Sequence, residues 1–153
     1  MSTNRGKDFE NIVRSSISNL GIDITRLYDS TSGYISIHTT CDFIAYKYPT
    51  IYYIECKSID GNTLSIAALR QLDDLLEKKK YYGTRAGFLI WYKDHKLTYW
   101  VEADYVNELR KNGDKSINIK NLIVSEDNRV QLIPAVYKRV YGVYNFDKFF
   151  SII

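Results

Sequence analysis

The sequence has few of the residues that small extracellular domains use as covalent staples. Its 153 residues include two cysteines, Cys41 and Cys56. Two cysteines are too few for a disulfide framework, and two thiols alone do not make a zinc site, which normally has four ligands. We therefore expect both to be reduced and buried in the core. We also expect a cytoplasmic protein.

Long apolar stretches are also missing. The longest, such as GFLIWY, are a handful of residues, far short of the about 20 that cross a membrane as a helix. The N-terminal residues are charged and no apolar segment follows them, so we expect no signal peptide and no membrane partner. Repeats, low-complexity tracts and linkers are absent. A chain of this length can bury roughly 68–70% of its unfolded surface, which predicts a single domain over residues 1–153.

Charge of neither sign dominates. The sequence has 21 Lys and Arg residues against 18 Asp and Glu residues, a formal net charge of +3. This mildly basic balance permits a nucleic-acid partner but does not by itself indicate one. Tyrosine is abundant, with 14 copies, in an otherwise ordinary composition of 45% hydrophobic and 25% charged residues. Composition therefore leaves the function to be inferred from motifs.

Hydrophobic periodicity predicts a mixed α/β protein. Apolar residues at Phe9, Ile12, Val13, Ile17 and Leu20 form a helical stripe that Gly21 ends. Helices packed on a central sheet follow from the order of the remaining segments. We expect a helix over 3–21, a strand over 23–29, a turn-rich segment over 30–36, two strands within 39–58, a helix over 61–83, strands over 85–93 and 96–103, a helix over 104–113, and then loop, one strand and a last short helix.

The hairpin within this order places acidic side chains where apolar ones would pack better. If its turn is centred on residues 48–49, Asp42 stands opposite Glu55 and Thr40 stands opposite Lys57. Opposite residues of an antiparallel pair point to the same side, with Cβ atoms roughly 4.5–5.5 Å apart. Two carboxylates therefore converge on one face, with an ammonium group one pleat away. The other face is expected to join the core and carries Cys41, Phe43, Ala45, Ile54 and Cys56.

Two acids that face each other destabilise a hairpin unless something neutralises them. A divalent cation bound by oxygen ligands would do so, and Mg²⁺ is typically held by one or two carboxylates. We therefore predict a Mg²⁺ site at Asp42 and Glu55. A slip of one residue in the register would instead send the acids to opposite faces. The alternative interpretation is a solvated hairpin face whose charges have no chemical role.

The run Glu55-Cys56-Lys57, with Asp42 before it, resembles the motif of the PD-(D/E)xK nuclease superfamily, without the proline that precedes the first acid. The stretches NRGKDFE, TTCDF, IECKS and LRQLDDLL together resemble RecU-type Holliday-junction resolvases in a short, phage-like version, over about the first two thirds of the chain. The resemblance implies a restriction-endonuclease-like fold, a central mixed β-sheet flanked by helices. It also implies a homodimer that nicks branched DNA symmetrically, with Mg²⁺ as cofactor and Mn²⁺ as a substitute.

The resemblance assigns roles to individual residues. Asp42 and Glu55 would bind one or two metal ions, and the backbone carbonyl of Cys56 would be a further ligand. Lys57 would stabilise the pentacovalent transition state or orient the attacking water. Thr40 matches the threonine of the family's Thr-x-Asp pair.

Two matches lie outside the hairpin. Glu10 on the first helix would reach the sheet edge and a second metal ion, and Gln71 on the next helix would hold a water at the metal. Each also has a plain interpretation, as a solvated helix charge for Glu10 and as a surface glutamine for Gln71. Arg70 stands where the family usually has histidine.

Arg5, Lys7 and Arg70 are the expected DNA contacts. Arg5 and Lys7 lie at a helix start, where positive charge opposes the helix dipole; phosphate contact would explain them, and solubility is the alternative. The lysines and tyrosines of 77–82 (EKKKYY) suit DNA, although a solvated helix end is the better explanation for them. Segment 29–37 stands where the family inserts a stalk that probes the junction centre, but it is short.

Two other functions stay open. The chain is a restriction or repair nuclease of the same superfamily if its cleavage does not depend on DNA structure. It is a DNA-binding module that no longer cuts if it binds without cleavage in Mg²⁺. The intact Asp42, Glu55 and Lys57 argue against the second alternative.

Overall fold

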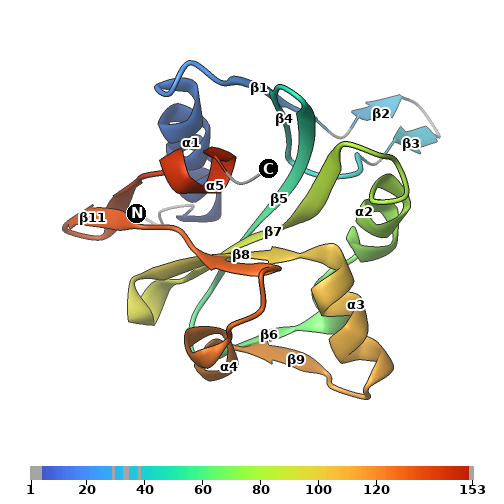
Figure 1. Cartoon of the computed structure of the whole chain (residues 1–153), viewed down its shortest axis with the longest axis vertical. Helices are drawn as coiled ribbons and strands as arrows, with labels where there is room; N and C mark the ends of the chain where they lie inside the picture. The colour runs from blue at the N-terminus through green and yellow to red at the C-terminus, as the bar shows by residue number, and fades with distance from the viewer. Residues whose placement is uncertain (1–4, 29, 33–34, 38, 152–153) are drawn as a thin grey trace.

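A six-stranded mixed sheet forms the centre of the computed structural model, which describes residues 5–28, 30–32, 35–37 and 39–151 (Figure 1). The strand order is β1-β4-β5-β7-β8-β10, with β5 and β7 parallel and the other neighbours antiparallel. The expected mixed sheet is therefore confirmed. Its strands are β1 (Asp23–Arg26), β4 (Phe43–Lys47), β5 (Thr50–Ile59), β7 (Thr84–Tyr92), β8 (Leu97–Glu102) and β10 (Val130–Leu132).

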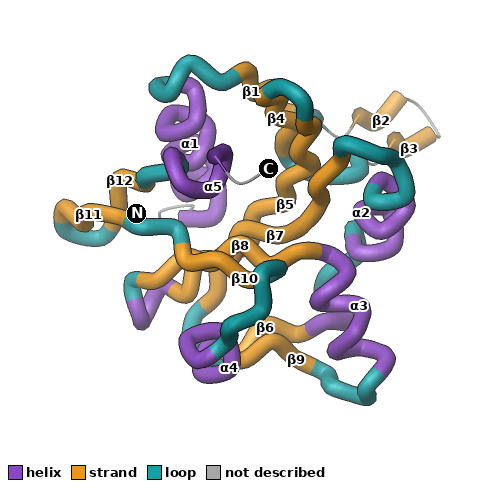
Figure 2. The backbone as a smooth tube through the Cα atoms, viewed as in Figure 1, coloured by secondary structure: helices purple, strands orange, loops and turns teal. Residues whose placement is uncertain are grey.

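Helices and small hairpins cover both faces of this sheet (Figures 1 and 2). One core cluster joins the sheet to α1 (Arg5–Ser18), α5 (Asp147–Ser151) and a hairpin of β11 (Ala135–Lys138) and β12 (Tyr141–Tyr144). The second cluster lies on the other face. It joins the sheet to α2 (Leu72–Lys78), α3 (Ala103–Lys111), α4 (Ile119–Val124) and the paired strands β6 (Thr63–Ser65) and β9 (Ser116–Asn118).

Strand β7 shows why the sheet needs cover on both sides. Every residue from Ala86 to Tyr92 is buried, as expected for a strand with apolar layers above and below it. Gly87 permits the close approach of β8, because a Cβ at this position would lie 2.5 Å from the carbonyl oxygen of Val101. The continuous apolar run in the sequence therefore marks the centre of the protein.

The expected helix over 61–83 is wrong in its first half. Residues Thr63–Ser65 pair as a strand with Ser116–Asn118, which places Leu64 opposite Ile117, and both side chains are buried. A 3₁₀ turn (Ile66–Ala68) follows, and α2 begins only at Leu72. Pairing with a segment about fifty residues downstream thus overrides local helical spacing.

The remaining differences are smaller. Helix α1 is shorter than the expected 3–21, and the first strand ends at Arg26. The segment expected to be turn-rich contains two short antiparallel strands, β2 (Ser30–Ser32) and β3 (Ile35–Ile37), while residues 29, 33, 34 and 38 lie outside the described part. After α3 the chain forms four strands and two helices, where one strand and one helix were expected.

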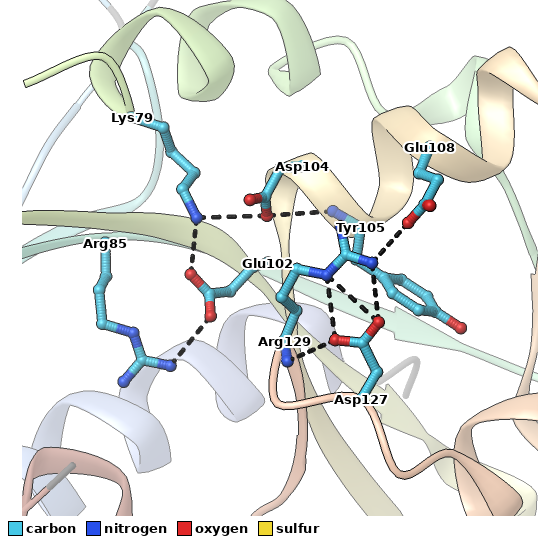
Figure 3. Close-up of polar contacts among 8 residues, drawn as sticks. All are labelled: Lys79, Arg85, Glu102, Asp104, Tyr105, Glu108, Asp127 and Arg129. Atoms are coloured by element: carbon cyan, nitrogen blue, oxygen red, sulfur yellow. Dashed lines mark hydrogen bonds and ion pairs between the residues drawn. The ribbon is translucent and has the colours of Figure 1, made fainter. Parts of the chain in front are cut away.

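Two groups of ion pairs join α2, α3 and the C-terminal half to the sheet (Figure 3). In the first, Glu102 accepts from Lys79 at 2.7 Å and from Arg85 at 3.4 Å, and Lys79 also lies 3.2 Å from Asp104. The guanidinium of Arg85 is packed among the rings of Tyr52, Trp100 and Phe149, 5.0 to 5.7 Å from their centroids. In the second, Arg129 pairs with Asp127 and Glu108.

None of the described helices is long and apolar enough to span a membrane.

Candidate active site

The candidate site lies where the β4–β5 ladder ends. The ladder has the expected register and its last pair is Phe43 with Ile54, so Asp42 and Glu55 are the next residues on the two sides. The N–H of Cys56 donates to Asp42 Oδ2 at 2.9 Å. The Asp42 carboxylate therefore accepts the hydrogen bond that this N–H would otherwise donate to a carbonyl of the neighbouring strand. The hydrogen bond holds Asp42 beside Glu55.

The Asp42 carboxylate lies close enough to Glu55 to raise the pKa of Glu55. Glu55 is buried, with 4% of its surface exposed. Burial and then the neighbouring Asp42 carboxylate raise the pKa of Glu55 to about 8. Lys57 opposes this rise, with its Nζ 3.3 Å from Glu55 Oε2. Without metal, the Glu55 carboxyl therefore holds its proton to a higher pH than an exposed glutamate does.

A third acid approaches from α1. Glu10 forms an ion pair with Arg26 at 2.6 Å, and both side chains are mostly buried. Burial and then Asp42 raise the pKa of Glu10, while Arg26 and Lys57 lower it. Glu10 is therefore close enough to the hairpin to respond to its charges, although α1 packs on the opposite face of the sheet from α2.

Arg26 is the residue of this site that the sequence analysis missed. It is the last residue of β1 and pairs with Phe43 in the sheet. Its guanidinium lies over the rings of Tyr28 and Phe43, at 5.3 and 5.4 Å from their centroids, and bonds Glu10. The only signal in the sequence is a cation at the end of a short strand, which is too common to single out.

Lys7 and Arg5 lie in the first turn of α1, as expected, and both are exposed. Lys7 lines an open groove beside the site; the other lining residues are Gly6, Glu10, Asn11, Arg14, Arg26 and Tyr28. Three cations against one acid make this groove a surface that suits phosphate.

Thr40, Gln71 and Arg70 are less closely tied to the acids. Thr40 is half-buried in the bend before Asp42. Gln71 directly precedes α2, and its buried Oε1 has no hydrogen-bond partner among the described residues. Arg70 is exposed and lines a different groove, together with Arg110 and Lys115. Within the described part, no hydrogen bond or ion pair links any of the three to Asp42, Glu55 or Lys57.

The two cysteines are free and buried, as expected. However, they do not face each other in one core. Cys41 packs in the cluster on the α2 side, whereas Cys56 packs in the cluster on the α1 side. The reason is that regular pairing stops at Phe43, so the alternation of the strand does not extend to Cys41.

The residues fit a divalent cation held partly by its own waters. Within the described ranges, no three His, Cys, Asp or Glu side chains form a preassembled metal cluster. Two carboxylates nevertheless meet at Asp42 and Glu55, in a place where burial disfavours the charge of Glu55. Mg²⁺ is usually bound by one or two carboxylates and keeps several waters or phosphate oxygens. This donor set is therefore sufficient for Mg²⁺ and too small for a closed protein cage.

Comparison with known proteins places this geometry in a family. Among solved structures, the chain is similar to Hjc, a Holliday junction resolvase from the archaeal hyperthermophile Archaeoglobus fulgidus, with a TM-score of 0.55 and 16% identity over 75% of this chain and 89% of that chain. At this identity the likeness shows the fold. No curated protein matches the sequence significantly. The sequence model of the archaeal Holliday junction resolvase (Hjc) family matches residues 1–133. The expectation of a Holliday-junction resolvase is thus confirmed, while the narrower RecU type is not the family that matches. Because the match covers most of the chain, the protein belongs to the archaeal Holliday junction resolvase family.

Proposed function

We propose that this protein is a metal-dependent endonuclease that resolves four-way DNA junctions by paired symmetric nicks. The observation that carries the proposal is the meeting of Asp42 and Glu55 at the end of the β4–β5 ladder, with Lys57 Nζ 3.3 Å from Glu55. Two facing acids, one of them the buried Glu55, are an unfavourable arrangement for folding alone. Its presence in a resolvase family member supports a catalytic role.

Asp42 and Glu55 would hold Mg²⁺, or Mn²⁺ in its place, with the carbonyl of Cys56 and the carboxylate of Glu10 as further ligands. A divalent cation at this position supplies Lewis acidity at a phosphate oxygen and lowers the pKa of water. Glu10 can take part only if Arg26 releases it or shares it, because the two form an ion pair at 2.6 Å. Arg26 would then be free to bond a phosphate oxygen.

Lys57 would act on the reacting phosphate. Its side chain is partly exposed on the same face as Glu55, so it can reach DNA while remaining beside the acid pair. There it would stabilise the negative charge that builds on the phosphate in the transition state or orient the attacking water. Gln71 would hold a water near the metal, which would supply a partner for its buried Oε1, and Thr40 would support Asp42.

The DNA contacts that we propose begin at the groove along α1. Lys7, with Arg14 and Arg26, would bind phosphates beside the scissile bond, and Arg5 would extend this contact. Arg70 would contact a second arm of the junction from its own groove. Two symmetric cuts need two identical sites, so we propose a homodimer with two-fold symmetry. In a cell it would act in the cytoplasm, the host's if the gene is viral, and in recombination or repair.

A direct test uses a labelled four-way junction, a duplex and a single strand, each incubated with and without Mg²⁺. We expect paired symmetric nicks in the junction, only with the metal, and no cutting by Asp42→Asn, which should still bind the junction in EDTA. The matched control is Asp147→Asn, an exposed acid in the first turn of α5. Cleavage of duplex and junction at equal rates would instead indicate a restriction or repair nuclease. Binding without cleavage would indicate a DNA-binding module.

A further inference from the structure

The exposed aromatic side chains of this protein are not scattered. Among the described residues, the exposed large aromatic side chains are all tyrosines: Tyr28, Tyr46, Tyr48, Tyr81 and Tyr82. Tyr82 is fully exposed, and Tyr48 and Tyr81 are 81% and 63% exposed. Exposed aromatic groups that gather in one place usually mark a binding surface.

Four of these five tyrosines lie on adjoining segments, and we name them the tyrosine cluster: Tyr46, Tyr48, Tyr81 and Tyr82. Tyr46 lies in β4, next to the β4–β5 turn that carries Tyr48. Tyr81 and Tyr82 belong to the loop between α2 and β7. The two segments touch, because the N–H of Ile51 donates to the carbonyl of Gly83 at 2.8 Å. A Cβ on Gly83 would lie 3.1 Å from the carbonyl of Pro49.

The cluster is continuous with the face that carries the acid pair. Ile51, Tyr53, Glu55 and Lys57 alternate along β5 and therefore point to one side of the sheet. Tyr46 stands opposite Ile51 and points to that same side. Four residues separate Ile51 from Glu55, about 13 Å along a strand.

Cations accompany the rings. Lys78 Nζ lies 5.4 Å from the centroid of the Tyr53 ring, between the cluster and the acid pair. Lys80 is exposed and pairs with the equally exposed Glu77. Lys79 differs, since it points away and bonds Glu102 (Figure 3). The cluster therefore has many ring faces and few free cations, whereas the backbone of a duplex is bound chiefly by Lys and Arg.

We infer that the tyrosine cluster binds unpaired nucleotides, whose bases stack on the exposed rings. Base pairs within a duplex hide their faces, so only unpaired bases can use such rings. The inference rests on the proposed function, because it deepens the substrate from any four-way junction to branched DNA with unpaired nucleotides about 13 Å along β5 from the acid pair. Lys78 and Lys80 would contact the phosphates between those bases.

The test measures binding of a fluorescent oligo(dT) single strand in EDTA, with a blunt duplex of equal length as the comparison. Stacking of one base contributes enough that Tyr82→Ala should weaken oligo(dT) binding by about 5- to 150-fold. Affinity for the duplex should change less than about twofold, since no base face is available there. Tyr82→Phe keeps the ring and should bind like wild type, whereas Tyr82→Leu keeps apolar area without a ring and should bind like Tyr82→Ala. Val136→Ala, at an exposed apolar residue on β11, is the control for surface truncation.

Several results would overturn the inference. The first is that Tyr82→Ala binds oligo(dT) as tightly as wild type does. The second is that Tyr82→Ala loses equal affinity for the duplex and for the single strand. The third is that Tyr82→Leu and Tyr82→Phe bind oligo(dT) with the same affinity. A change of mass in light scattering without a change in oligo(dT) affinity would assign the cluster to a protein contact and would also overturn it. Junction cleavage by the wild type in Mg²⁺ is measured separately. Its absence would refute the proposed nuclease without deciding the binding experiment.

Discussion

Replacing Glu55 with glutamine should change how the stability of the metal-free protein depends on pH. Burial and the Asp42 carboxylate raise the pKa of Glu55 from 4.5 to about 8. The folded state therefore holds this proton more tightly than the unfolded state does. The group stabilises the fold below pH 4.5, and this contribution is lost as the pH rises through 8.

The size of the effect follows from the shift. One pKa unit corresponds to about 1.36 kcal/mol, so wild type should lose about 4 kcal/mol of unfolding free energy through this group between pH 5 and pH 9. The Glu55→Gln variant has no proton to lose and should lack this loss. The variant should therefore become the more stable protein at alkaline pH, while Mg²⁺ at pH 9 should stabilise only wild type, since it binds the ionised pair.

Urea unfolding followed by tryptophan fluorescence measures the unfolding free energy of both proteins at pH 5, 7 and 9, in EDTA and again with Mg²⁺. Glu77→Gln is the control, because Glu77 has 59% of its side chain exposed and pairs with exposed Lys80. The difference between wild type and Glu55→Gln should vary with pH, and that between wild type and the control should not. A difference that stays constant from pH 5 to pH 9 would refute the reasoning, because Glu55 would then be ionised throughout.

Three further outcomes are expected. Lys57→Ala should reduce the single-turnover cleavage rate by a factor on the order of 10²–10³, with its melting temperature and junction affinity unchanged. A lowered melting temperature with full specific activity would instead indicate that Lys57 stabilises the fold and has no catalytic role. Junction binding should weaken steeply as salt rises, while the preference for junction over duplex survives moderate salt; equal affinities across a salt series would contradict resolution of junctions. Arg85→Ala should lower the unfolding free energy by about 1–3 kcal/mol, because it removes a guanidinium packed among three rings and one of the two cations on Glu102. Arg129→Ala, whose partner Glu108 is largely exposed, should cost about 0–1 kcal/mol in the same urea assay, and equal losses would contradict this account.

The site was predictable from the sequence where its residues belong to one hairpin. The short turn around Tyr48 and Pro49 fixes the register, and alternation along the strands then assigns each residue to a face. Asp42, Glu55 and Lys57 could therefore be placed beside one another before any fold was known. The same argument failed at Cys41, one residue before Asp42, because the chain leaves the ladder there.

The fold was predictable where local pattern and burial agree. The apolar run of β7 and the stripe of α1 are long enough to specify their own structure. Segment 61–83 was not predictable in this way. Its apolar residues have helical spacing, but Leu64 is buried by a strand pair with Ile117, far along the chain. No property of the segment itself indicates that this pairing competes successfully with a longer helix.

The ion pair of Glu10 with Arg26 could not be predicted from the sequence. The stripe of Phe9 and Val13 predicts that α1 packs on the sheet, and it leaves Glu10 at the flank of that stripe. Which strand Glu10 meets depends on the sheet order, and β1 is its edge strand. At this edge Arg26 forms an ion pair with Glu10, and the charge of Asp42 influences both. The third acid is thus held beside the acid pair by the order of strands in the sheet, whereas the pair itself is held by the register of one hairpin.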